Sequence, residues 1–371
     1  MSDARVNGRL PTVTVDIGPL LEDHWTGIPV FTRRLVQALL REGSVDVDFS
    51  FRLTQVPKEA VLAAIRVGSG TLLRSEFERN AGKNYPLIDP RSNVLFPSVK
   101  ECFNVARREA STVHDVSTLV MPECHEQANI DHHLRSMARQ LASDDVVFCA
   151  SEATRAALTL MFPSVESKTQ VLHQYVDWPE HFAAIERNLP PPVLGKYAVV
   201  IGTIEPRKNL ELLINALGMP EVRDSEIKFV VIGKKGWKVD QLLGELTPHE
   251  REHILFSGFV TEFMKYRLLR HAEFLVFPSI YEGFGIPALE AMSLGKPVLA
   301  AMTSSFPEII GDSGVYFDPL SATEFAAAFA EISDEGKLAE LAPKALERES
   351  SFGWQQMARP VVRWACGDLH S

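Results

Sequence analysis

The stretch FPSIYEGFGIPALEAMSLGKPVLAA, residues 277–301, joins the end of an apolar strand to a glycine-containing loop, an apolar helix and a second apolar strand. Pro287 suits the first turn of that helix, where a backbone N–H has no partner to lose. Apolar strands that alternate with helices predict a parallel sheet covered by helices on both faces. The stretch therefore predicts an α/β fold.

The same alternation extends over residues 197–333 and, less regularly, over the first half of the chain. Three consecutive prolines in NLPPPVLGK, residues 188–196, interrupt it and predict a linker. We expect two doubly wound, Rossmann-like domains facing each other across a cleft, at 1–187 and 188–350. A helix at 351–371, kinked by Pro360, is expected to cross back to the first domain.

Composition excludes several classes of protein. The 371 residues carry a net charge of −10, which argues against a general nucleic-acid binder because such proteins need basic surfaces. The four cysteines are widely spaced, without a disulfide framework or zinc spacing, which indicates reduced thiols in the cytoplasm. Neither a secretory signal nor an apolar run of membrane-spanning length is evident, so we expect a cytoplasmic protein, with peripheral contact at the inner membrane face left open.

Two glutamates of the opening stretch are candidates for ligand binding. Glu282 lies in the loop with Gly283, Phe284 and Gly285, and Glu290 lies in the helix among apolar residues. Carboxylates only accept hydrogen bonds, so both suit a polyhydroxylated ligand, and the glycines allow close backbone approach. The alternative makes Glu282 a first-turn acid and Glu290 an exposed helix residue. A carboxylate among apolar neighbours, however, needs a partner.

A second candidate follows the strand that ends at Gly202 and Thr203. Arg207 and Lys208 come next, just before a helix that begins near Asn209. Two cations at the carboxyl end of a parallel strand, close to a helix amino terminus, are suited to a diphosphate. The alternative is a pair of solvated loop residues with Asn209 as the helix cap.

The first half offers weaker candidates. His114-Asp115 follows an apolar strand, and Gly27 precedes the first helix; a satisfied histidine and an ordinary loop glycine are the alternatives. The histidines near Cys124 lack metal-site spacing, so no metal is expected. Residues 66–92 have weak periodicity and are expected to be irregular, and their basic residues make them a candidate acceptor or lipid contact: Arg66, Arg74, Arg79 and Lys83.

Together, GTIEPRKN (202–209), IGKKGW (232–237) and the opening stretch resemble the signature of family 4 glycosyltransferases with the GT-B fold, and bacterial mannosyltransferases of polysaccharide biosynthesis in particular. TGIPVFTRRL (26–35) and TVHDVSTLVMPE (112–123) are similar to that family's glycine loop and His-Asp stretch. The resemblance implies a retaining sugar transfer from a nucleotide-sugar donor, without a cofactor or required metal.

The resemblance also implies roles for the candidates. Arg207 and Lys208 would hold the diphosphate, Glu290 the ribose hydroxyls and Glu282 the donor sugar. Phe284 and Gly285 would offer backbone N–H groups, with Gly202, Thr203 and Gly283 in the same donor site. His114 would lie beside the donor sugar and Gly27 beside the phosphates. Catalysis would depend on Glu282, Arg207, Lys208 and His114.

Two departures stand out. Pro29 occupies the place of a second glycine in the first loop, and VLHQYVD (171–177) replaces the usual ending of that segment. The expected function is transfer of a hexose to a saccharide or lipid-linked saccharide acceptor. Mannose is the first choice of sugar and GDP-mannose the first choice of donor. A non-catalytic nucleotide-sugar-binding partner of a glycan assembly complex is the alternative.

Overall fold

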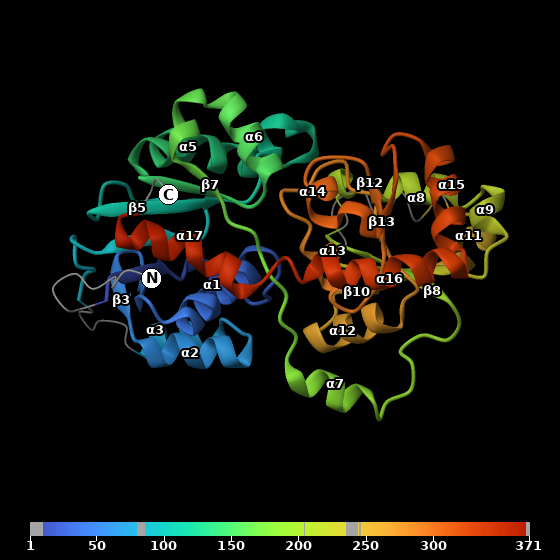
Figure 1. Cartoon of the computed structure of the whole chain (residues 1–371), viewed down its shortest axis with the longest axis horizontal. Coiled ribbons are helices and arrows are strands. Elements are labelled where there is room, and N and C mark those ends of the chain that lie inside the picture. The colour runs from blue at the N-terminus through green and yellow to red at the C-terminus, as the bar shows by residue number, and fades with distance from the viewer. Residues whose placement is uncertain (1–9, 80–85, 204, 235–243, 245, 369–371) are drawn as a thin grey trace. The chain divides into compact units, whose positions relative to one another are not determined.

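The computed structural model describes residues 10–79, 86–203, 205–234, 244 and 246–368. The chain packs into two compact units (Figure 1). Unit 1 comprises Met1–Tyr175 and Phe352–Ser371, and unit 2 comprises Val176–Ser351. The segment 188–196, predicted as a linker, lies inside unit 2 between α7 (Glu180–Glu186) and β8 (Tyr197–Ile201).

Unit 1 is built on a sheet with the strand order β3-β2-β1-β4-β5-β6-β7. All neighbours are parallel except β3, which pairs antiparallel with β2. The strands are β1 (Thr12–Asp16), β2 (Asp46–Phe51), β3 (Thr54–Val56), β4 (Asn93–Phe96), β5 (Arg108–Val113), β6 (Val146–Cys149) and β7 (Thr169–Val171). The helices are η1 (Gly18–Leu21), α1 (Ile28–Glu42), α2 (Lys58–Val67), α3 (Thr71–Arg79), α4 (Ser117–Val120), η2 (Pro122–Cys124), α5 (Gln127–Ser143), α6 (Glu152–Met161), η3 (Pro163–Lys168) and α17 (Trp354–Cys366).

The helix α17 belongs to the core of unit 1, as the sequence predicted for a helix that crosses back. It packs against α1, and Trp364 is fully buried with its ring edge-on to Phe148 at 6.4 Å between centroids. Arg108 donates to the carbonyl oxygen of Trp364 at 2.8 Å. Pro360 lies within α17 and does not end it.

Two residues of the unusual 171–177 segment anchor the chain where it leaves unit 1. The ring of His173 lies edge-on to Phe352, 5.3 Å between centroids, at the point where the chain returns. The hydroxyl of Tyr175 donates to the carbonyl oxygen of Arg34 at 3.2 Å. Both side chains therefore have a structural role within unit 1.

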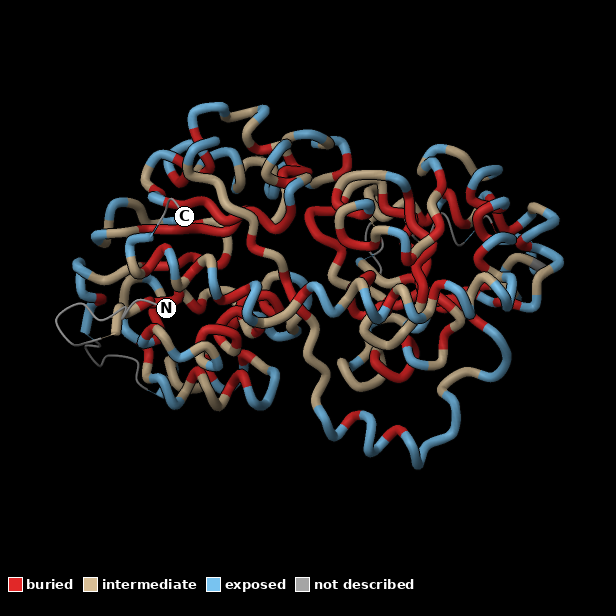
Figure 2. The backbone as a smooth tube through the Cα atoms, in the orientation of Figure 1, coloured by how far each residue is buried: buried red, intermediate tan, exposed pale blue. Residues whose placement is uncertain are grey.

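Unit 2 has an all-parallel sheet with the order β10-β9-β8-β11-β12-β13. Its further strands are β9 (Lys228–Ile232), β10 (Ile254–Gly258), β11 (Leu275–Phe277), β12 (Val298–Ala301) and β13 (Gly314–Phe317). Its further helices are η4 (Pro206–Lys208), α8 (Leu210–Ala216), α9 (Pro220–Arg223), α11 (Pro248–His253), α12 (Glu262–His271), α13 (Ile286–Met292), α14 (Phe306–Ile310), η5 (Gly311–Ser313), α15 (Ala322–Ser333) and α16 (Glu335–Glu349). Buried residues run along the strands of each unit (Figure 2), and the predicted fold class is confirmed.

One local prediction was wrong. Residues 66–92 were expected to be irregular, but α3 occupies Thr71–Arg79. The helix is stabilised by a few contacts that the weak periodicity of its apolar residues does not reveal. Leu73 is fully buried, and Phe77 packs on Phe51. Arg74 bonds to the Leu21 carbonyl and the Asp23 carboxylate, so its charge is engaged within the chain. Lys83 lies outside the described residues.

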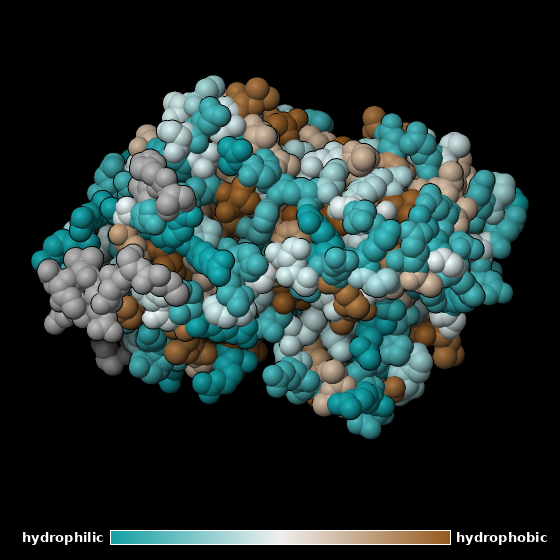
Figure 3. Space-filling model, in the orientation of Figure 1, coloured by the Kyte–Doolittle hydropathy of each residue, from teal (hydrophilic) through white to brown (hydrophobic). Residues whose placement is uncertain are grey.

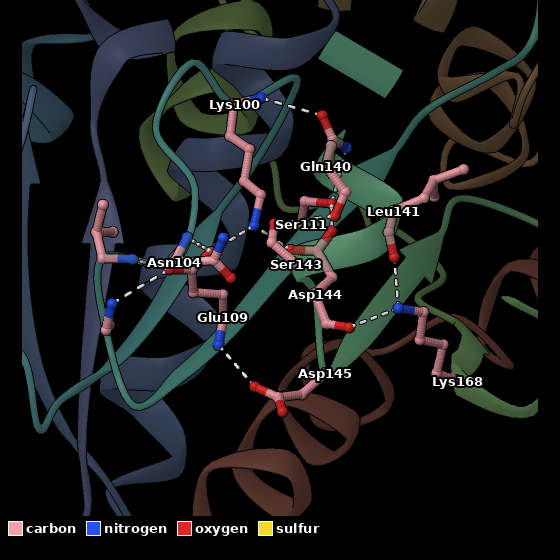
Figure 4. Close-up of polar contacts among 12 residues, drawn as sticks. Lys100, Asn104, Glu109, Ser111, Gln140, Leu141, Ser143, Asp144, Asp145 and Lys168 are labelled. Carbon is pink, nitrogen blue, oxygen red and sulfur yellow. Dashed lines mark hydrogen bonds and ion pairs between the residues drawn. The ribbon is translucent and has the colours of Figure 1, made fainter. Parts of the chain in front are cut away.

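A buried ion cluster fixes the connection between β4 and β5 (Figure 4). Lys100, with no exposed side-chain surface, bonds to Glu109 at 2.7 Å and to Asp144 at 2.5 Å. Glu109 also accepts from the backbone N–H groups of Asn104, Val105 and Ala106, while Asp144 accepts from Ser111 at 2.5 Å. The β4–β5 connection contains no helix, and the buried ion pairs therefore hold it in place.

The face shown in Figure 3 has no large apolar patch, because hydrophilic residues separate small groups of apolar residues. Among the described residues, no helix combines the length and apolar character needed to cross a membrane.

Candidate active site

The two main candidate loops follow neighbouring strands of unit 2. Arg207 and Lys208 follow β8, and Glu282 follows β11, the strand hydrogen-bonded to β8. The strand order reverses between β8 and β11, because β9 continues on one side and β12 on the other. Ligands of such sheets bind at this reversal, outside the carboxyl ends of the strands.

The three side chains converge on one another. The ammonium group of Lys208 forms an ion pair with Glu282, and Arg207 lies 3.4 Å from the other carboxylate oxygen of Glu282. Arg207 also donates to the Tyr281 carbonyl at 2.8 Å and pairs with Glu205 at 2.8 Å. The side chains of Arg207, Lys208 and Glu282 are 12%, 19% and 10% exposed, so the alternative of solvated loop residues is wrong.

The charge state of Glu282 is set by this pairing. Burial alone would raise the pKa of its carboxyl, but Lys208, Arg207 and hydrogen bonds outweigh burial and hold the pKa below its usual value. Glu282 is therefore ionised at neutral pH, with a negative charge fixed between two cations. A polyanionic ligand at this place would compete with Glu282 for both cations.

Serine and threonine side chains hold the 279–285 loop in place. Ser304 accepts from the backbone N–H of Glu282 at 2.9 Å, and Ser305 donates to the carbonyl oxygens of Glu282 and Phe284 at 3.0 and 2.9 Å. Gly283 and Phe284 are buried in this loop. Gly285 has φ of +97° at the start of α13, and a Cβ there would lie 3.2 Å from the ring of Phe306. Only glycine fits this backbone without strain.

Glu290 has the partner that its apolar surroundings required. It is 1% exposed on α13, and Lys265 of α12 bonds to its carboxylate at 2.7 Å. The Lys265 ammonium group also lies 5.5 Å from the ring of Trp178. The alternative of an exposed Glu290 is therefore wrong, and Lys265 is a site neighbour that sequence spacing alone did not indicate.

Asn209 does not cap α8 with its side chain. It occupies the N-cap position with φ of +55°, and its amide donates to the carbonyls of Pro278 and Pro319 at 3.2 and 2.8 Å. The amide thus ties the Arg207–Lys208 loop to the start of the Glu282 loop. Thr203, which follows the preceding strand β8, is exposed.

The backbones of Gly202 and Gly233 lie against each other in the site. Gly202 has φ of +156° and its Cα faces the Lys208 chain, while a Cβ on Gly233 would lie 1.9 Å from the Gly202 carbonyl oxygen. Within the segment IGKKGW, Gly233 is therefore needed for close packing against Gly202. Of the segment's basic residues, Lys235 lies outside the described residues.

Replacing Gly233 with alanine is expected to destabilise unit 2 by about 1–3 kcal/mol, because the methyl group must push β8 and β9 apart. Gly218→Ala is the control, since a Cβ there meets nothing within 4 Å. Thermal unfolding of both variants measures the difference. Equal stability of the two variants would contradict the close approach.

The unit 1 candidates lie together at the carboxyl edge of its own sheet. The Nε2–H group of His114 donates to the Pro97 carbonyl at 2.7 Å, and its ring packs edge-on to Phe31, 4.6 Å between centroids. Burial lowers the pKa of His114, so the imidazole is neutral at pH 7. Gly27 is exposed at the N-cap of α1 with φ of +51°, one turn before Phe31, whose N–H bonds to its carbonyl.

Asp16 is a further candidate that sequence reasoning missed. It ends β1, and its carboxylate accepts from the Gly18 N–H at 2.9 Å. Burial raises its pKa to about 6 against hydrogen bonds from Gly18 and Arg52, and the charge of Glu101 raises it further. Arg52 has φ of +48°, unusual for a non-glycine residue. An acid at a strand's carboxyl end, two residues before a glycine, was the available signal.

Asp16→Asn is expected to stabilise unit 1 at neutral pH. The native state holds the Asp16 proton more tightly than an unfolded chain with the ordinary pKa of 3.8, so wild-type stability falls as pH rises from about 4 through about 6. The gain in thermal midpoint should be full above pH 6 and absent below about pH 4. The exposed Asp46→Asn is the control; a gain independent of pH would refute the explanation.

Among the described residues, no group of three or more histidine, cysteine or acidic side chains is arranged to hold a metal ion. The unit 2 site offers fixed charges and carboxylates that accept hydrogen bonds.

Comparison with known proteins places the chain among relatives of known family. A family model described as "Glycosyl transferases group 1" matches residues 182–347. The O-antigen chain mannosyltransferase B of Escherichia coli is 30% identical over 269 residues, 69% of this chain and 69% of that protein. The serotype-specific mannosyltransferase WbdA of Escherichia coli is 31% identical over 294 residues, 75% of this chain. That match covers only 34% of WbdA, so this chain spans about a third of that longer relative.

A solved structure shares the whole architecture. The crystal structure of WaaG, described as a glycosyltransferase involved in lipopolysaccharide biosynthesis, superposes with a TM-score of 0.64 at 16% identity, over 96% of this chain and 100% of that one. This similarity confirms the GT-B fold.

Proposed function

The chain belongs to the group 1 glycosyl transferases, and on that premise we propose that it is a retaining mannosyltransferase of polysaccharide biosynthesis. Its donor is a nucleoside-diphosphate sugar, with GDP-mannose the first candidate, and its acceptor is a saccharide or lipid-linked saccharide. The mannosyltransferase names of the relatives support the sugar. The protein would work in the cytoplasm, in keeping with four cysteines that are not joined by disulfides.

One observation carries the proposal: Arg207, Lys208 and Glu282 converge at the strand-order reversal of unit 2. Two cations in a partly buried site are suited to a diphosphate, which Arg binds as a fork and Lys as a point charge. When the donor binds, these cations exchange the carboxylate for phosphate oxygens. Glu282 then accepts hydrogen bonds from the hydroxyls of the donor sugar.

The reaction would draw on the same charges. As the glycosidic bond breaks, negative charge grows on the diphosphate and positive charge grows on the sugar ring. Arg207 and Lys208 stabilise the first, without reorganising during the step. Glu282 stabilises the second. Transfer with retention would take place on one face of the sugar, with a phosphate oxygen of the leaving group accepting the acceptor's proton.

The remaining candidates support the donor around this centre. Glu290, held by Lys265, accepts from the ribose hydroxyls. The buried backbone of Gly283, Phe284 and Gly285 borders the phosphates, as does Gly202. His114, neutral and fixed by Pro97, would border the donor sugar, and Gly27 the phosphates.

Thermal stabilisation by a panel of nucleotides tests the proposal. GDP, UDP and ADP and their sugars are compared with and without a chelator. A ligand at a hundred times its dissociation constant adds about 2.7 kcal/mol of stability, which is readily seen. A selective shift with GDP-mannose that survives chelation, followed by transfer to a mannose acceptor, is expected. Binding without turnover on any acceptor would instead favour a non-catalytic partner.

A further inference from the structure

A pocket of about 440 Å³ lies in unit 1 between the segment 101–103 and the outward side of α5, and none of the residues assigned to the donor lines it. Its volume falls in the range of ligand pockets, roughly 300–1,000 Å³. The residues that line it are predominantly charged or polar: Glu101, Phe103, Ala128, Asp131, His132, Arg135, Ser136 and Arg139.

The α5 side chains of the pocket recur on successive turns. Asp131 pairs with Arg135 at 3.3 Å, and these side chains are 42% and 81% exposed. Arg139 lies over the ring of Phe103, 4.4 Å from its centroid, and joins the helix to the opposite wall. Met137 and Leu141, on the other side of α5, are buried against the unit. The buried side of α5 therefore packs the helix onto unit 1, and the side chains on its outward side leave the pocket open.

The charges of the pocket indicate the chemistry of its ligand. The lining includes two carboxylates, Glu101 and Asp131, and two guanidinium groups, Arg135 and Arg139. A lone anion would be repelled by the first pair and a metal cation by the second. A hydroxyl group both donates and accepts hydrogen bonds, so a neutral polyhydroxylated ligand satisfies both pairs at once.

The pocket also adjoins the edge of the sheet where ligands bind. Glu101 contributes to the raised pKa of Asp16, after the larger effect of burial, so its charge lies near the carboxyl end of β1. In the strand order of unit 1, β1 stands at the reversal between β2 and β4. A chain-like ligand that reaches this edge can continue into the pocket.

We propose that this pocket is a subsite for a saccharide unit of the acceptor, at a distance from the sugar that receives the transfer. The inference rests on the proposed function, because that function makes the acceptor a glycan. The subsite would make the protein prefer longer acceptors over short ones.

A kinetic test compares mannose oligosaccharides of increasing length as acceptors. In the wild type, kcat/KM rises once the acceptor reaches the pocket. The double variant Asp131→Ala/Arg135→Ala removes an exposed ion pair without leaving an unpaired charge, and is expected to lose about tenfold on long acceptors. Its activity on the shortest acceptor is expected to be unchanged. The matched control is Arg223→Ala/Asp224→Ala, an exposed pair in unit 2 with a 2.8 Å contact.

A labelling test needs no turnover. Cys102 lies between the lining residues Glu101 and Phe103 and is partly exposed, as is Cys366 elsewhere in unit 1. Reaction with a thiol reagent is followed at each cysteine by mass spectrometry, with a long mannose oligosaccharide or a cellulose oligosaccharide present. Slower labelling of Cys102 with the mannose ligand, at an unchanged rate for Cys366, is expected.

The outcomes separate this inference from the proposed function. The subsite proposal is wrong if the double variant keeps the wild-type preference for long acceptors and the ligand does not protect Cys102. Sugar transfer under those conditions still supports the proposed function. Protection of Cys102 without transfer to any acceptor supports a saccharide site while the function fails. Protection that persists in the double variant assigns the binding elsewhere and overturns the proposal.

Discussion

Replacing Lys100 with methionine is expected to destabilise unit 1 by about 3–5 kcal/mol, because it leaves two buried carboxylates without their cation. Glu109 keeps its three backbone N–H donors, whereas the Asp144 carboxylate loses Lys100 and keeps the short bond from Ser111. Burial already raises the pKa of Asp144 despite Lys100. Asp144 should therefore carry most of the penalty.

Two companion variants make this test specific. Lys344→Met removes a lysine whose pair with Glu340 is exposed, and should cost at most about 0.5 kcal/mol. Adding Asp144→Asn to Lys100→Met should recover part of the loss by removing one unpaired charge. Hydrogen exchange measured by mass spectrometry distinguishes unit 1 peptides from unit 2 peptides. Equal costs for the two lysines would show that the buried cluster is not what orders the β4–β5 connection.

The Lys100→Met penalty should also depend on pH. Without the cation the pKa of Asp144 rises further, so the carboxyl takes up a proton and its burial costs less in acid. The difference between wild type and variant should therefore shrink as pH falls below neutrality. A difference that grows in acid would contradict this account.

Lys208→Ala is expected to lower the rate of sugar transfer by about 10²–10³-fold, by analogy with loss of one donor from an oxyanion hole. Binding of GDP should weaken as well, since in the proposed function the cation contacts the diphosphate before and during the reaction. The control is Lys228→Ala, an exposed lysine at the start of β9. Transfer at the wild-type rate would remove Lys208 from the catalytic assignment.

Glu282→Gln should have different effects on GDP binding and on sugar transfer. In the structure the carboxylate occupies both cations, so its neutral replacement no longer competes with a diphosphate. We expect GDP to bind at least as tightly as in the wild type, while transfer falls sharply. Weakened GDP binding, as in Lys208→Ala, would mean that Glu282 supports the phosphate site rather than opposing it.

The sequence predicted local elements well where apolar periodicity and flanking residues agreed. The strand, loop and helix around Glu282 are an example: β11 ends at Phe277, Gly285 takes φ of +97° and α13 begins at Ile286. Each feature depends on neighbours within a few residues. The need for a partner at Glu290 was likewise evident from its apolar surroundings.

The contacts between loops could not be predicted in this way. Glu282 and Lys208 are separated by 74 positions, and their ion pair depends on β8 and β11 being neighbours. The same holds for Lys265 with Glu290 and for the serines that hold the loop. The α3 helix was missed for a related reason, because Phe77 packs on a distant strand rather than on its own helix.

The membership of α17 in the core of unit 1 affects how the protein is made. Unit 2 is one continuous segment, Val176–Ser351, whereas the core of unit 1 lacks Trp364 until that residue has been synthesised. At about 5–20 residues per second, the ribosome needs on the order of ten seconds or more to cover the segment between. Unit 1 must wait through that interval with part of its apolar surface uncovered, while unit 2 can close first. We therefore expect the unit whose synthesis begins first to be the last to complete its fold.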